Sequence, residues 1–151
     1  MSADSRFFVD TNVLLYSVDA KEARKQKQAR LWLAALWESG AGRLSWQVLH
    51  EFYAYAVRKT GAAPTPARKT VEAFERWRPV EMNRGLIQRG WHWMDKAGVS
   101  YWDSLILAAA EQAGCSWMLS EDFQTGRAYG PVTVVNPFER APADFGFDAT
   151  S

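Results

Sequence analysis

Four acidic residues fall where a parallel α/β sheet would gather them at one edge. Asp10 follows the short apolar stretch 7–9, and Asp122 follows the apolar stretch 117–120. Glu51 and Asp103 lie in the early turns of two predicted helices. The ends of parallel strands and the first turns of the helices that follow them share the edge where such sheets bind ligands. We therefore expect the four carboxylates to lie close together.

Clustered carboxylates repel one another and repel anionic substrates, so their chemistry depends on a bound cation. Oxygen ligands suit hard divalent ions such as Mg²⁺ or Mn²⁺, which lower the pKa of a bound water and neutralise charge on a phosphate. The chain has two histidines, His50 and His92, which is too few to favour a histidine-based zinc site. The acids therefore predict metal-assisted phosphodiester cleavage centred on Asp10 and Asp103.

These acids also have structural explanations. Asp10 could be a helix cap or turn residue, although an aspartate in the first strand-to-helix turn favours function. Glu51 flanks the apolar stripe of its helix, so a surface acid and a ligand fit its position equally well. Glu121 precedes Asp122, and the sequence leaves open which of them faces the site. The same edge receives the neutral polar side chains of Asn12, Ser120 and Asn136, and the Ser120 hydroxyl is placed to orient a carboxylate or water.

Asp103 has the strongest structural explanation, because Ser100 and Asp103 have the spacing of a capping box. Helical periodicity argues for a second role. Asp103 falls on the same face as the apolar Ile106, whereas Ser104 and Glu111 mark the more polar face. An acid on an apolar face needs a cation or a base as partner. Capping and metal binding are compatible at this position.

Predicted strands alternate with predicted helices along the chain. Strands are expected at 7–9, 43–46, 117–120 and 132–135, with a weak one at 79–82. Helices are expected at 11–16, 22–38, 47–59, 67–77, 84–97 and 101–113, and loops at 61–66 and 121–131. Residues 139–151 show no period and are expected to form a tail. This order predicts one domain over 1–151, with a three-layer α/β/α fold around a small parallel sheet.

Length and composition are typical of a single soluble domain. The chain has 151 residues, of which 48% are hydrophobic, and a net charge of +1, so any basic contact with nucleic acid must be local. No apolar run reaches the ~18 residues of a membrane span, and the first apolar stretch is short for a secretory signal. We therefore expect a cytoplasmic protein. Cys115 stands in an apolar run and is expected to be a buried hydrophobic residue.

Basic and aromatic side chains could contact a nucleic acid. The basic residues between 21 and 30 are expected to be mostly solvated, with some available to phosphate. Trp46, Tyr101 and Trp102 could stack on bases or serve packing, and packing is favoured for most of them.

Four segments in order resemble the PIN-domain family, and most specifically its VapC-type toxins. They are FVDTNVL at 8–14, VLHEF at 48–52, YWDSLI at 101–106, and LSEDFQTG at 119–126 leading to VNPF at 135–138. Each segment alone is weak evidence. Their order, spacing and the total length are specific, and together they cover the chain to about Phe138.

The resemblance implies a PIN-like fold and an endoribonuclease that depends on Mg²⁺ or Mn²⁺. By position, Asp10 and Asp103 match the metal ligands of the family, Glu51 its second acid and Asp122 its fourth. Ser120 stands where the family usually has threonine, which keeps the hydroxyl. Toxins of this kind cleave single-stranded or structured RNA, are blocked by a small antitoxin protein, and usually form homodimers.

Other enzyme classes fit less well. A haloacid dehalogenase-like phosphatase would need an aspartate at Asn12, and a receiver-like domain would need a late lysine, whereas no lysine follows Lys96. Two alternatives within the family stay open. One is an RNA-processing nuclease without a toxin role, and the other is a non-catalytic module that binds RNA or protein. The second alternative predicts the loss of an acid, and all four are present.

Overall fold

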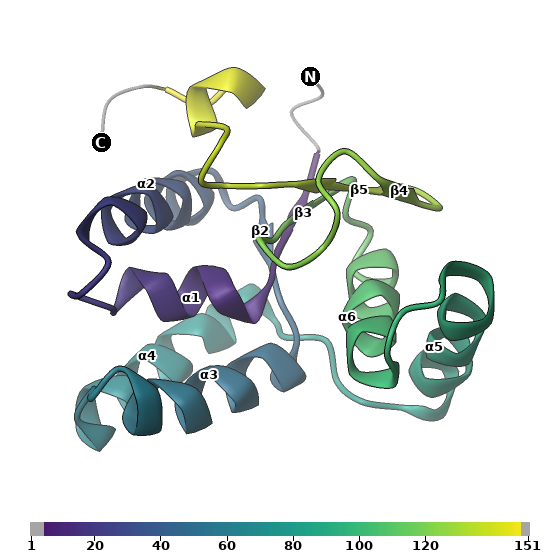
Figure 1. Cartoon of the computed structure of the whole chain (residues 1–151), viewed down its shortest axis with the longest axis horizontal. Coiled ribbons are helices and arrows are strands. Elements are labelled where there is room, and N and C mark those ends of the chain that lie inside the picture. The colour runs from purple at the N-terminus through teal and green to yellow at the C-terminus, as the bar shows by residue number, and fades with distance from the viewer. Residues whose placement is uncertain (1–4, 149–151) are drawn as a thin grey trace.

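The computed structural model describes residues 5–148 and contains a five-stranded, mostly parallel sheet (Figure 1). The strands are β1 (Phe7–Val9), β2 (Gly42–Arg43), β3 (Trp117–Leu119), β4 (Ala128–Tyr129) and β5 (Val132–Val135). Their spatial order is β2-β1-β3-β5-β4. All neighbours pair in parallel except β4, which runs antiparallel to β5. The predicted small, mostly parallel sheet is confirmed.

Within the described residues, six α-helices surround this sheet in the predicted three-layer α/β/α arrangement. They are α1 (Thr11–Ser17), α2 (Ala23–Ser39), α3 (Trp46–Lys59), α4 (Pro64–Phe74), α5 (Arg84–Ala97) and α6 (Tyr101–Gln112). Four of them begin where a polar side chain accepts a hydrogen bond from the first turn: Asp10, Ser45, Asn83 and Ser100. Helices α5 and α6 pack side by side, as do α3 and α4 (Figure 1). Between residues 5 and 148, no helix has the length and apolar character needed to cross a membrane.

One face of the sheet is covered by α2 and by the short 3₁₀ helix η2 (Pro142–Phe145). The ring of Phe7 lies 5.6 Å from those of both Trp32 and Phe145, measured between centroids. The Trp32 indole N–H also donates to the backbone carbonyl oxygens of Pro137 and Arg140. Residues 139–148 are therefore packed against the domain, which differs from the expected tail; residues 149–151 of that tail lie outside the described part.

The structure differs from the strands predicted at 43–46 and 79–82. Ser45 accepts a hydrogen bond from the N–H of Val48, so α3 begins at Trp46 and β2 ends at Arg43. Val80 forms one isolated parallel bridge with Ser45 in place of a strand over 79–82. The expected loop over 121–131 contains β4, whose two residues pair with β5.

Cys115 is buried, as expected for a small hydrophobic residue. Burial raises the pKa of its thiol to about 12, outweighing the charges of Arg43 and Arg6, which lower it. The thiol therefore stays protonated at neutral pH and is a poor nucleophile.

Gly42 has no room for a side chain, because a Cβ there would lie 2.4 Å from Cη2 of the Trp77 ring. That ring is 6% exposed. We expect Gly42→Ala to lower the free energy of unfolding by about 2 kcal/mol in urea denaturation. Gly85→Ala is the control, since a Cβ there would meet only the Asn83 side chain, at 3.4 Å. Wild-type stability in Gly42→Ala would contradict this packing, and adding Trp77→Leu should restore part of the loss.

Candidate active site

Asp10 lies between β1 and α1, and its side chain is the most buried of the four acids, at 6% exposed. Its Oδ1 accepts a hydrogen bond from the backbone N–H of Thr11 at 2.8 Å, so Asp10 caps α1. Its Oδ2 accepts from the hydroxyl of Ser120 at 2.7 Å and from the side-chain amide of Asn12 at 3.1 Å. The capping explanation is thus correct, but it uses only one of the two oxygens.

The pKa of Asp10 is raised to about 7, and burial is the main cause. The hydrogen bonds from Ser120 and Thr11 lower this pKa, whereas the charges of Asp122 and Glu51 raise it. Asp10 therefore changes between its protonated and ionised forms near neutral pH. A cation beside it would favour the ionised form.

Asn12 and Ser120 connect Asp10 to the loop that follows β3. The amide nitrogen of Asn12 lies 3.2 Å from Ser120 Oγ and 3.2 Å from Asp122 Oδ2, in addition to its contact with Asp10. The Ser120 side chain is fully buried, and its oxygen also accepts from the backbone N–H of Asp122 at 3.1 Å. Both predicted supporting residues therefore contact acids of the candidate site.

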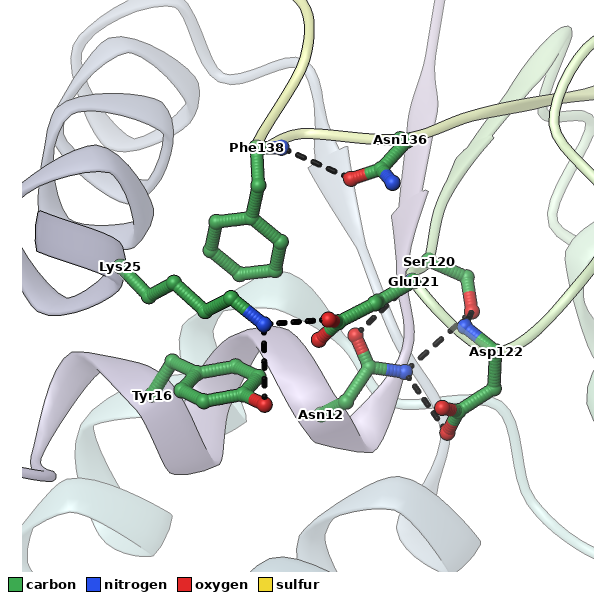
Figure 2. Close-up of polar contacts among 8 residues, drawn as sticks. All are labelled: Asn12, Tyr16, Lys25, Ser120, Glu121, Asp122, Asn136 and Phe138. Atoms are coloured by element: carbon green, nitrogen blue, oxygen red, sulfur yellow. Dashed lines mark hydrogen bonds and ion pairs between the residues drawn. The ribbon is translucent and has the colours of Figure 1, made fainter. Parts of the chain in front are cut away.

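Glu121 and Asp122 point in different directions, which answers the question the sequence left open (Figure 2). Asp122 lines the cleft that also contains Asp10. The carboxylate of Glu121 pairs with Lys25 of α2, while its backbone N–H donates to the side-chain oxygen of Asn12 at 3.1 Å. Of this neighbouring pair, Asp122 therefore belongs to the site.

All four acids line one cleft of about 190 Å³. Glu51 accepts a hydrogen bond from the hydroxyl of Thr11 at 2.8 Å, which fixes one of its oxygens. Asp103 is exposed to solvent, and its backbone N–H donates to Ser100 Oγ at 3.1 Å, as the capping box predicts. Partial loss of hydration raises the pKa of Asp103; the hydrogen bond with Ser100 opposes the rise and the charge of Asp122 adds to it.

The prediction that Ser104 marks the polar face of α6 is wrong. Ser104 is fully buried, and its hydroxyl donates to the backbone oxygen of Tyr101 at 2.6 Å. The reason is the contact with α5, where Gly90 approaches so closely that a Cβ would lie 3.0 Å from Ser104 Oγ. A small side chain suits that contact. The prediction that Asp103 lies on an apolar face is also wrong, because Asp103 is exposed and lies on the open side of the helix.

Asn136, expected at the same edge, lies near the site without contacting its acids (Figure 2). Its side-chain oxygen accepts from the backbone N–H of Phe138 at 2.9 Å. Its own backbone N–H donates to the Thr125 hydroxyl at 3.2 Å. These contacts shape the turn after β5.

Several neutral residues of the cleft escaped the sequence reasoning. They are Thr11, Leu15, Gln47, Tyr55 and Ile106. A signal existed for two of them, because Gln47, Glu51 and Tyr55 are spaced four residues apart and share one face of α3. Trp102, for which the sequence left open stacking on bases or packing, also lines the cleft and is 63% exposed, so packing does not explain it.

The donor chemistry of the cleft fits a hard divalent cation. Within residues 5–148, no arginine or lysine forms an ion pair with any of the four acids. In that same range, no three His, Cys, Asp or Glu side chains converge enough to hold a metal by themselves. Mg²⁺ commonly binds one or two carboxylates and keeps several waters. A site with Asp10 and Asp103 as its protein ligands is consistent with both findings.

Comparisons with known proteins extend this description. The model of the PIN domain family matches residues 7–130, whereas no curated protein matches the sequence. Among solved structures, the chain is similar to VapC20 of Mycobacterium tuberculosis, a toxin that cleaves the sarcin-ricin loop, with a TM-score of 0.58 and 22% sequence identity. That match covers 77% of this chain and 89% of the other. Because the family match includes the segments that carry all four acids, the chain belongs to the PIN domain family.

Proposed function

We propose that the protein is a Mg²⁺- or Mn²⁺-dependent endoribonuclease, the toxin of a toxin–antitoxin pair. The observation that carries the proposal is the cleft that is lined by four carboxylates from separate segments. Membership of the PIN domain family supports nuclease chemistry, and the likeness to VapC20, a toxin that cleaves the sarcin-ricin loop, supports RNA as the substrate.

The side chains divide the work of the site. Asp10 and Asp103 would hold the divalent ion, which when bound supplies an activated water and neutralises charge on the phosphate. The hydrogen bonds from Ser120 and Asn12 fix the oxygen of Asp10 that does not cap the helix. Thr11 fixes Glu51. Together with Asp122, the carboxylates of these residues give the cleft the negative charge that attracts the cation.

The proposal includes partners and location. The substrate is RNA, and a small antitoxin protein blocks the cleft. The toxin acts as a homodimer in the cytoplasm. A short antitoxin gene beside this gene is expected, and an isolated gene would favour an RNA-processing nuclease.

The test is a cleavage assay on RNA with Mg²⁺ or with EDTA, comparing the wild type with Asp103→Asn. We expect cleavage only with Mg²⁺, and a loss of at least about a hundredfold in Asp103→Asn. Asp95→Asn, an exposed acid on α5, is the control and should retain activity. Activity that survives both EDTA and Asp103→Asn would overturn the metal–carboxylate proposal. A folded wild type that cleaves no RNA would favour the non-catalytic binding module.

Trp102 is expected to stack on an unpaired base of the substrate. It lies in the cleft beside Asp103 with 63% of its side chain exposed. We expect Trp102→Ala to raise KM about tenfold with little change in kcat, whereas Trp102→Phe retains most of the affinity. Trp91→Ala is the control, since Trp91 is 53% exposed and lies outside the residues that line the cleft. A fall in kcat at constant KM would contradict stacking.

A further inference from the structure

Lys25 joins three segments of the chain beside the candidate site (Figure 2). It belongs to α2, and its ammonium group pairs with Glu121 in the loop after β3. The same group lies 3.3 Å from the hydroxyl of Tyr16 on α1. It also lies 4.7 Å from the ring centroid of Tyr16 and 5.4 Å from that of Phe138. The ammonium is therefore held by an ion pair, a hydrogen bond and two aromatic faces.

Both polar partners of Lys25 flank Asn12. Tyr16 lies four residues after Asn12 and therefore on the same face of α1. Glu121 donates its backbone N–H to the side-chain oxygen of Asn12 at 3.1 Å. That bond leaves the amide nitrogen of Asn12 directed at Asp10 and Asp122. Lys25 thus restrains both segments that determine how this amide is oriented.

The Lys25 pair also removes a fifth negative charge from the site. Glu121 is adjacent to Asp122, and without a partner its carboxylate would add to the repulsion among the other acids. Contact with Glu121 raises the pKa of Lys25, so the lysine is charged at every physiological pH. Only 25% of the Lys25 side chain and 28% of that of Glu121 are exposed, so water screens the pair less than a fully exposed one.

We infer that Lys25 is a positioning residue of the carboxylate cleft, which acts through Glu121 and Tyr16 to orient Asn12. The inference rests on the proposed nuclease function for its kinetic consequence. Its structural consequence, a fixed Asn12 amide, does not depend on any activity.

The experiment compares Lys25→Met, which keeps the aliphatic stem, with Lys25→Arg and Glu121→Gln. Lys27→Met is the matched control, because Lys27 is an exposed lysine on the same helix. NMR measures hydrogen exchange at the backbone N–H of Glu121 and the chemical shifts of the Asn12 side-chain amide. RNA cleavage gives kcat, KM and the salt dependence of KM.

In Lys25→Met we expect faster exchange at Glu121 and shifted Asn12 amide signals. We also expect kcat to fall by about tenfold, the effect typical of a residue that orients a metal-site group. KM and its salt dependence should stay unchanged. Lys25→Arg should restore most of kcat, and Lys27→Met should match the wild type. Glu121→Gln should lower kcat less than Lys25→Met does, since it leaves no unpaired acid. In the double variant, Lys25→Met should lower kcat little beyond the effect of Glu121→Gln alone.

Two outcomes would overturn the inference. A higher KM with a weaker salt dependence, at unchanged kcat and Glu121 exchange, would make Lys25 a phosphate contact. Wild-type values of every measured quantity in Lys25→Met would mean that Lys25 and Glu121 form an ordinary surface ion pair without a positioning role. If the wild type cleaves no RNA, the NMR measurements alone decide, so failure of this inference differs from failure of the proposed function.

Discussion

Asp10→Asn is expected to abolish RNA cleavage and, without metal, to make the folded protein more stable at pH 8. The loss of activity follows from the proposed role of Asp10 as a ligand, and a fall of at least about a thousandfold is expected. The gain in stability follows from its burial. A carboxylate that is 6% exposed and close to other acids is costly to ionise.

The pH dependence follows from the pKa of Asp10, which folding raises from 3.8 to about 7. Between these values the folded state keeps a proton that the unfolded state has lost, so stability falls as the pH rises through this window. Each pH unit in this window lowers the free energy of unfolding of the wild type by up to about 1.4 kcal/mol. Asparagine does not titrate, so Asp10→Asn lacks this loss. Part of this gain is offset, because the side-chain amide of asparagine replaces the Oδ2 atom that accepts two hydrogen bonds. At pH 8 we therefore expect the variant to be more stable than the wild type by about 2 kcal/mol.

Urea unfolding at pH 5 to 8 in EDTA measures this difference, with Asp95→Asn as the control. As the pH rises, the free energy of unfolding of the wild type should fall relative to that of Asp10→Asn. The same pH dependence in both proteins would contradict the raised pKa of Asp10. Adding Mg²⁺ at pH 8 should stabilise the wild type but not Asp10→Asn, because only the wild type has the ligand.

Sequence topology was sufficient to place the acids at one cleft. Asp10 and Asp122 follow β1 and β3, and Asp103 lies in the first turn of α6, so the positions follow from strand ends and helix starts alone. These are local features that repeat in every parallel sheet. The fold class was predictable for the same reason, because alternating strands and helices admit few arrangements.

Long-range contacts determined what the sequence could not predict. Which of Glu121 and Asp122 faces the cleft depends on Lys25, which lies 96 positions from Glu121. Helical periodicity identifies the faces of α6 but not the helix that packs on each, so the burial of Ser104 against Gly90 was missed. The segment after residue 139 has no period of its own, and Trp32 nevertheless binds its backbone.

Ser120→Ala is the second substitution with a large expected effect. The fully buried Ser120 hydroxyl donates to Asp10 and accepts from the backbone N–H groups of Asp122 and Phe123 at 3.1 and 3.4 Å. Its removal leaves buried polar groups without a partner. We expect the free energy of unfolding to fall by about 2 kcal/mol in urea denaturation. Cleavage should fall by about 10- to 100-fold, because Asp10 loses the group that orients it.

The pH profile of cleavage distinguishes a role at the site from a loss of packing. The hydrogen bond from Ser120 lowers the pKa of Asp10, so its removal should raise that pKa and move the acid limb of the profile to higher pH. Ser104→Ala is the matched control, since Ser104 is equally buried but donates only within its own helix. It should cost less than about 1 kcal/mol and leave the pH profile unchanged. An equal shift in both variants would contradict the coupling of Ser120 to Asp10, because burial alone would then explain the effect.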